Sequence, residues 1–152
     1  MERALVVVDE TEASDELLKK AGDIAKGLDA KLYLFGTLDP EEFDEARETL
    51  DTIGEVENTS YTDSDILKTV HTSLNETIEE VFGEADFAYE TVGAVAGEGD
   101  RASKVIEAAE KFECGHIFLS GRKRSPTGKA LFGDTVQSVL LDFDGEVTVN
   151  LQ

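Results

Sequence analysis

The chain has 152 residues, 40% of them apolar, which is enough for one hydrophobic core, so we expect a single folded domain over 1–152 and not a disordered acidic tail. Its 34 Asp and Glu residues against 14 Lys and Arg leave a formal net charge of -20 at pH 7, which argues against binding to nucleic acid or anionic membranes. The acidic excess, with no Trp, is also typical of proteins from salt-loaded cytoplasm and suggests a halophilic source.

The first third of the chain predicts a strand, a helix and a second strand. Residues 3–10, RALVVVDE, form a β-branched apolar run that suits a strand buried on both faces, and it is too short for a signal-peptide core or a membrane span. We therefore expect a cytoplasmic protein. Residues 11–30 repeat apolar side chains at three- and four-residue spacing, as in an amphipathic helix, and residues 31–39 give the second strand. Together they form a βαβ unit.

The rest of the chain continues the alternation after a polar interruption. Residues 39–64 are charge-dense with weak periodicity, and we interpret them as an excursion loop with a short helix near 41–50. A helix from about Asp65 to Phe82 follows. After it we expect a strand within 87–97, a helix at 101–112, a strand at 115–121, a helix at 133–143 and a strand at 146–151. Five strands and four main helices predict an α/β fold, an open doubly wound parallel sheet with helices on both faces, Rossmann-like.

A basic loop lies where such a sheet places its ligands. Ligands bind beyond the carboxyl ends of the strands, at the point where the strand order reverses, which selects residues 9–11 and 121–135. Glycines let backbone N–H groups converge on an anion, and the helix that follows adds its positive end. A solvated loop that offsets nearby carboxylates is the alternative. The glycines and cations of this loop are Gly121, Arg122, Lys123, Arg124, Gly128, Lys129 and Gly133.

Two common nucleotide motifs are excluded by spacing. A Walker A loop needs four residues between its glycines and a hydroxyl after the lysine, whereas six residues separate Gly121 from Gly128 and Ala130 follows Lys129. The dinucleotide fingerprint fails because Gly97 and Gly99 lack a third glycine. Binding of a nicotinamide or flavin dinucleotide is therefore not supported.

Catalytic signals are weak. His71 falls in an apolar-striped helix and His116 in a strand, with no metal-spaced or nucleophile–base cluster beside them, so we interpret both as structural. Cys114, the single cysteine, is interpreted as a small buried hydrophobe, and Asp100 as a helix cap. We assign no catalytic residue; slow ATP hydrolysis is the most that the sequence allows.

Three segments resemble the universal stress protein family. VVVDETEAS at 6–14 resembles its first strand and polar turn, VAGEGDRAS at 95–103 its third strand and following turn, and GRKRSPTGKALFGDT at 121–135 its nucleotide loop. The acidic composition suggests a haloarchaeal member. The ATP-binding branch has a loop of the form G-x2-G-x9-G-[ST]. Gly121 matches its first glycine, Arg124 stands in place of the second, and Asp134 separates Gly133 from Thr135.

The resemblance implies an adenine nucleotide alpha hydrolase-like fold and a regulatory stress-response protein that binds ATP or AMP, with Mg2+ when ATP is the ligand. Asp9 would accept hydrogen bonds from the adenine or ribose, although a role as a cap or turn residue is the alternative. It also implies a homodimer paired through the last strand, and a regulatory protein partner. A family member that has lost nucleotide binding, and acts as a dimeric interaction module, is the other interpretation. The nucleotide-binding residues would be Asp9, Gly121, Arg122, Arg124, Gly128, Lys129, Gly133 and Thr135.

Overall fold

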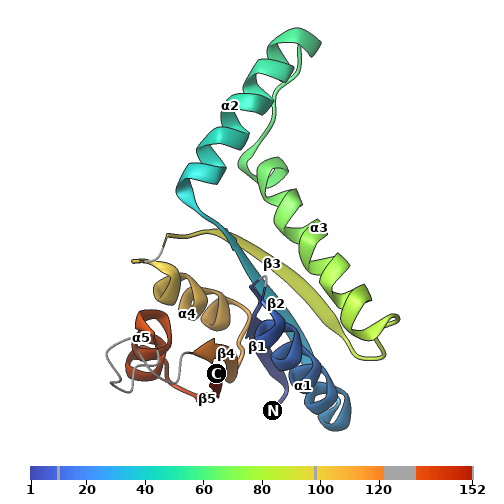
Figure 1. Cartoon of the computed structure of the whole chain (residues 1–152), viewed down its shortest axis with the longest axis vertical. Helices are drawn as coiled ribbons and strands as arrows, with labels where there is room; N and C mark the ends of the chain where they lie inside the picture. Colours follow the sequence, from blue (N-terminus) through green and yellow to red (C-terminus); the bar gives the residue numbers. More distant parts are fainter. Residues whose placement is uncertain (10, 98, 122–132, 152) are drawn as a thin grey trace.

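Five parallel strands form one sheet in the order β3-β2-β1-β4-β5 in the computed structural model, which describes residues 1–9, 11–97, 99–121 and 133–151 (Figure 1). The predicted doubly wound α/β fold is confirmed. The strands are β1 (Arg3–Val7), β2 (Lys31–Leu38), β3 (Tyr89–Val95), β4 (His116–Gly121) and β5 (Glu146–Leu151). The described helices are α1 (Glu12–Leu28), α2 (Pro40–Glu57), α3 (Asp63–Phe82), α4 (Arg101–Lys111) and α5 (Asp134–Asp142).

The strand order reverses between β1 and β4. From β1 the chain adds β2 and then β3 on one side, and it returns to place β4 and β5 on the other. The middle strand β1 reads as a continuous apolar run because both of its faces are covered, and Ala4, Leu5 and Val6 are fully buried. The predicted switch point therefore lies at the carboxyl ends of β1 and β4.

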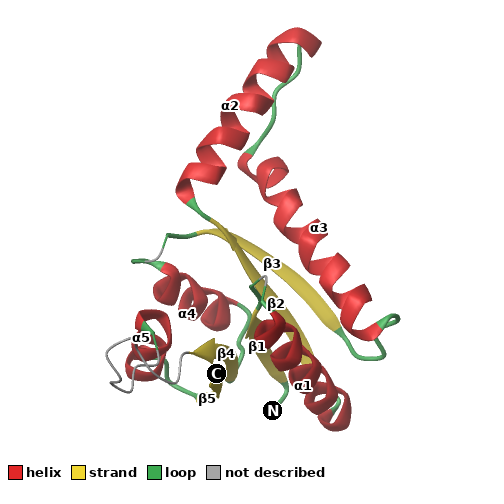
Figure 2. Ribbon diagram, viewed as in Figure 1, coloured by secondary structure: helices red, strands yellow, loops and turns green. Residues whose placement is uncertain are grey.

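Helices cover the two faces of the sheet in pairs. Alternate strand residues point to opposite faces, so Val6 and Phe118 pack with α1 and α3, whereas Leu5 and Leu119 pack with α4 and α5. Figure 2 shows α1 and α3 on one side of the sheet and α4 and α5 on the other.

The prediction of a long loop with only a short helix at 39–64 is wrong. In its place α2 runs from Pro40 to Glu57 and α3 already begins at Asp63, so the described residues form five helices rather than four main ones. Local signals explain α2: Asp39 and Glu42 form a capping box, and Asn58 closes the helix in the left-handed conformation. Its apolar periodicity is weak because, of its residues, all of which are described, only Gly54 is buried.

Asp9 is not a helix cap. Thr11 is the N-cap of α1, where its hydroxyl accepts the backbone N–H of Ser14. Gly133 stands at the N-cap of α5. Asp100 does occupy the N-cap position of α4, but its carboxylate accepts the N–H of Gly97 in the preceding turn instead of one from the helix. The part of the chain that the structure describes contains no helix long and apolar enough to cross a membrane.

Candidate functional site

The ends of three adjacent strands meet at one level on the carboxyl edge. Val6 of β1 pairs with Phe118 of β4, and Val7 pairs with Phe35 of β2. Beyond β1, Val8 still donates its backbone N–H to the carbonyl oxygen of Phe35 at 2.8 Å, and Asp9 follows directly. Because β1 lies between β2 and β4 in a parallel sheet, Asp9, Thr37 and Gly121 come from the carboxyl ends of three neighbouring strands, and we call these three residues the row at the switch point.

Asp9 is held in this row by the start of α1. Its Oδ1 accepts the backbone N–H of Thr11 at 3.0 Å and also the Thr11 hydroxyl, while its own N–H donates to Ser14 Oγ at 2.9 Å. Ser14 is 1% exposed, which makes it a buried anchor for the turn. Asp9 is therefore a turn residue, and its Oδ2 keeps the capacity to accept a hydrogen bond from a ligand amino or hydroxyl group.

A cavity of about 660 Å³ opens beside Asp9, within the range that small-molecule sites take. The end of β1 and the end of β2 form its floor, and α3 forms a wall of Ser and Thr hydroxyls that includes Thr69 and Ser73. Arg101 closes the α4 side, where its guanidinium donates from Nη2 to Thr37 Oγ1 at 3.1 Å. The cavity can therefore offer a ligand both hydrogen-bond donors and acceptors.

Thr37 and Arg101 are the site residues that the sequence interpretation missed. Both follow from the rule that ligands gather at carboxyl ends of strands, had it been applied to β2 and β3 as well as to β1 and β4. Thr37 lies near the end of β2, and Arg101 is the first residue of the helix that follows β3. The Asp100 carboxylate accepts the N–H of Gly97 at 2.6 Å and so tightens the turn that leads into Arg101.

The cavity is acidic. Four carboxylates line it in addition to Asp9, and Arg101 is the one basic residue among the described side chains of its lining. Like charges repel, so a phosphate group is disfavoured inside, whereas amino and hydroxyl groups can donate to the carboxylates. The additional carboxylates are those of Asp15, Glu42, Glu76 and Glu80.

The β4 side of the switch point differs in chemistry. Ser120 Oγ, just before Gly121, is the one buried side-chain nitrogen or oxygen among the described residues without a hydrogen-bond partner. Gly133 begins α5 at φ 89°, in the left-handed region that favours glycine, and Thr135 is half-buried in the first turn. Asp134 is exposed between them. The predicted ligand residues Arg122, Arg124, Gly128 and Lys129, with Lys123, lie outside the described residues.

The profile of Usp, the universal stress protein family, matches residues 1–149 of this chain. The chain belongs to the universal stress protein family. Among proteins with curated functional descriptions, none matches the chain. The halophilic source stays a prediction.

Solved structures of universal stress proteins share the fold. One from Archaeoglobus fulgidus is 20% identical and superposes with a TM-score of 0.63, with 98% of each chain covered. A universal stress protein described in complex with cAMP is 16% identical, with a TM-score of 0.63 over 99% of this chain and 96% of the other. A third, from Archaeoglobus fulgidus in complex with dAMP, is 15% identical, with a TM-score of 0.62 over 98% and 97%.

The histidines and the cysteine of this universal stress protein have structural partners. His71 Nδ1 lies 2.7 Å from Thr91 Oγ1 on β3. The ring of His116 stacks on that of Phe118 and hydrogen-bonds side chains of β5. Cys114 is 5% exposed, and burial raises the pKa of its thiol to about 11. The prediction that Cys114 is a small buried residue is confirmed, and both histidines have hydrogen-bond partners in the described part of the chain. The described residues contain no group of three or more His, Cys, Asp or Glu side chains that could hold a metal ion.

Proposed function

We propose that this chain is one regulatory domain, spanning 1–152, that binds an adenine nucleotide, ATP or AMP, at the ends of β1 and β4. The observation that carries the proposal is the row of Asp9, Gly121 and Thr37 across the switch point, beside a cavity of about 660 Å³. Family members described with cAMP and dAMP support the class of ligand. In the family's setting, the domain would report nucleotide level in the stress response.

Charge orients the nucleotide. The acidic cavity suits the uncharged adenosine portion, whose amino and hydroxyl groups can donate to Asp9 Oδ2. The phosphates would then lie toward Gly133 and Thr135, where the N-terminus of α5 supplies backbone N–H groups. By their place in the sequence, the cations of residues 122–129 flank that end. When ATP is the ligand, Mg2+ would neutralise part of the phosphate charge.

A second candidate function is an interaction module without nucleotide. Asp134 favours it, because this exposed carboxylate in the first turn of α5 repels a phosphate at the same helix end. Arg124 in place of the family's second glycine favours it too. We propose that the protein is a homodimer in either case. The edge strand β5, with half-buried Val147 and Val149, can pair with the same strand of a second copy.

Thermal unfolding with AMP and ATP tests the nucleotide site. Ligand at a hundred times its Kd should stabilise the fold by about 2.7 kcal/mol, which raises the Tm. Asp9→Asn keeps an oxygen for Thr11 but removes the charge, and we expect it to weaken binding about tenfold or more, because hydrogen bonds to charged groups are strong. Asp44→Asn on α2 makes the same change of charge at a residue that does not line the cavity, and it should bind as the wild type does.

The two candidate functions give different outcomes. No rise in Tm with millimolar adenine nucleotides, at low and at high salt, would sink nucleotide binding and leave the interaction module. If the Asp9 and Asp44 variants bound nucleotide equally weakly, the overall charge of the protein would explain the loss, and the proposed contact of Asp9 with the nucleotide would be wrong. Sedimentation of the same samples tests the shared dimer, which a monomer at all salt concentrations would contradict.

A further inference from the structure

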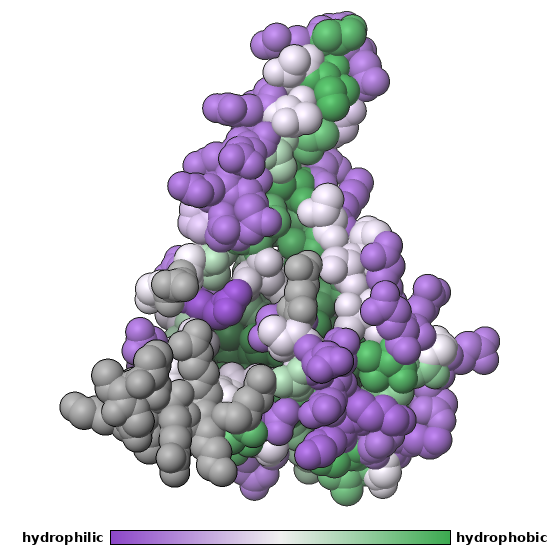
Figure 3. Space-filling view, in the orientation of Figure 1, coloured by the Kyte–Doolittle hydropathy of each residue, from purple (hydrophilic) through white to green (hydrophobic). Residues whose placement is uncertain are grey.

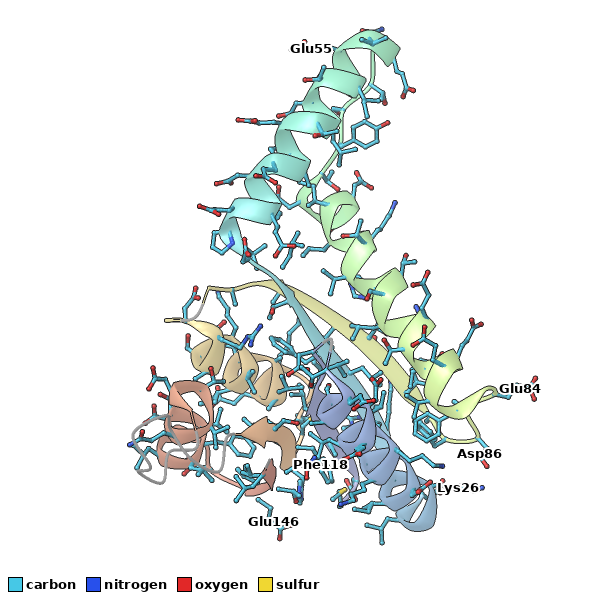
Figure 4. The ribbon with its side chains drawn as sticks, in the orientation of Figure 1. Lys26, Glu55, Glu84, Asp86, Phe118 and Glu146 are labelled. Atoms are coloured by element: carbon cyan, nitrogen blue, oxygen red, sulfur yellow. The ribbon has the colours of Figure 1, made fainter. Side chains whose placement is uncertain are left out.

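The helix α2, with the start of α3, forms an arm that projects from the carboxyl edge of the sheet (Figure 1). At 1.5 Å per residue the 18 residues of α2 span about 27 Å. All 18 are described, and only Gly54, near the tip, is buried. Figure 4 shows Glu55 at the tip, at the opposite end of the molecule from Lys26 and Asp86. Most of α2 therefore faces solvent on several sides.

An apolar stripe runs along this solvated helix. Phe43, Ala46 and Leu50 recur at helical spacing and are half-buried, and the stripe continues into Ile53, 39% exposed, and Val56, 84% exposed. Figure 3 shows apolar residues in a band up the arm, with hydrophilic residues gathered beside it. Exposed apolar residues in a row, rimmed by polar ones, are typical of a binding surface. Their three- and four-residue spacing is also the spacing of the apolar residues by which one amphipathic helix binds to another protein.

The charged residues beside the stripe are nearly all acidic. Residues 40–57 contain eight acidic residues and one basic residue, Arg47. Arg47 is engaged within the arm, where it pairs with Asp63 and donates to the carbonyl oxygen of Tyr61 at 3.1 Å. Arg47 also lies 3.9 Å from Asp51 one turn further along the helix. One guanidinium against eight carboxylates leaves residues 40–57 with a formal net charge of -7 (1 − 8). The acidic residues are Glu41, Glu42, Asp44, Glu45, Glu48, Asp51, Glu55 and Glu57.

We infer that the α2 stripe is a docking surface for a basic amphipathic helix of a partner protein. Apolar side chains of the partner would cover Ile53 and Val56, and its Lys and Arg residues would face the carboxylates on either side. Charge complementarity selects this occupant over a second copy of the chain. A second copy presents the same acidic helix, so pairing two arms would bring like charges together. The surface is separate from the proposed nucleotide site.

The test uses the full chain and a synthetic 18-residue helical peptide with Leu at three- and four-residue spacing and Lys elsewhere. A permuted peptide of the same composition, with its leucines scattered, controls for attraction by charge alone. Calorimetry at 150 mM salt measures affinity, and amide chemical shifts locate the bound peptide. We expect the amphipathic peptide to bind at least tenfold more tightly than the permuted one and to shift amides of α2.

Paired variants make the test specific. Ile53→Gln with Val56→Gln keeps a good helix former at both positions and should weaken peptide binding at least tenfold, with an unchanged Tm. The matched control is Leu140→Gln with Leu141→Gln on α5, two leucines that are 47% and 77% exposed, and it should leave binding unchanged. Equal binding of both peptides, shifts spread over other helices, or no loss in the α2 variant would each overturn the inference. So would a fall in sedimenting mass confined to the α2 variant, because a second copy would then be the occupant.

Discussion

Two helices of nearly equal length, α1 and α2, are stabilised in different ways. In α1, seven of 17 residues are buried, among them Leu17 and Leu18 against the sheet, whereas in α2 one of 18 is. Both have a capped N-terminus and a left-handed residue at the C-terminus. Caps and propensity can therefore define where a helix begins and ends, but packing decides how much of the fold's stability it carries. The contrast matches their proposed roles: α1 holds the turn of Asp9, and α2 presents a surface.

Core truncation should separate the two helices most strongly. Leu18→Ala removes a fully buried side chain of α1, and we expect the free energy of unfolding to fall by about 2–5 kcal/mol. Leu50→Ala, the matched change on half-buried α2, should cost less than about 1 kcal/mol. Urea denaturation measures both. A Leu50 variant as unstable as the Leu18 variant would show that the arm belongs to the cooperative core.

Glycine substitutions should act in opposite directions. A Cβ at Gly54 would lie 2.5 Å from the carbonyl oxygen of Thr59, so Gly54→Ala forces the end of α2 away from the following loop, at a cost of about 1–3 kcal/mol. A Cβ at Gly27 of α1 meets nothing within 4 Å, and Gly27→Ala should stabilise by about 0.4–1 kcal/mol, since it restricts the unfolded chain. Unfolding curves measure the change in the free energy of unfolding for each variant, and hydrogen exchange shows whether the destabilisation by Gly54→Ala is confined to the arm. Destabilisation by both would contradict the space seen around Gly27.

Acid should weaken the N-cap bond of α2, whose acceptor is a carboxylate, more than that of α1, whose acceptor is a hydroxyl. Accepting the backbone N–H of Glu42 lowers the pKa of Asp39 below its ordinary value, so the folded state favours the ionised cap. That stabilisation is complete above the ordinary pKa and is lost as the pH falls through the lowered one. The cap bond of α1 ends on the uncharged hydroxyl of Thr11. In an NMR titration, the amide of Glu42 should shift with a midpoint below about 3.9. A Glu42 midpoint at or above that value would contradict the lowered pKa.

The fold was predictable where periodicity was strong. The run at 3–10 and the stripes at 11–30 and 65–82 became β1, α1 and α3, because buried faces impose a regular apolar pattern. The prediction failed at 39–64 because α2 has almost no buried face to impose such a pattern. A helix that buries only Gly54 has a few apolar residues among eight acidic ones, so its apolar period is weaker than that of α1, and the capping box at Asp39 and Glu42 is the clearer signal of its start.

The candidate site was partly predictable. Asp9 and Gly121 could be selected because strand ends at a reversal of order share one edge. Thr37 and Arg101 could have been named as residues near strand ends, but their pairing could not be predicted, because it joins β2 to α4 across 64 positions of sequence and depends on how tightly the turn before Arg101 closes. The acidity of the cavity was equally hidden, since its carboxylates come from three different helices.

By itself the sequence determined the alternation of strands and helices, the class of sheet and the family, because these depend on local apolar period and on motifs of neighbouring residues. Tertiary structure alone decided the strand order that brings the carboxyl ends of β1 and β4 side by side, and the joining of Thr37 to Arg101. It also decided that α2 stands clear of the sheet while α1 lies on it. Two amphipathic helices of nearly equal length can carry similar caps, and only the surface available in the folded chain determines which of them is buried.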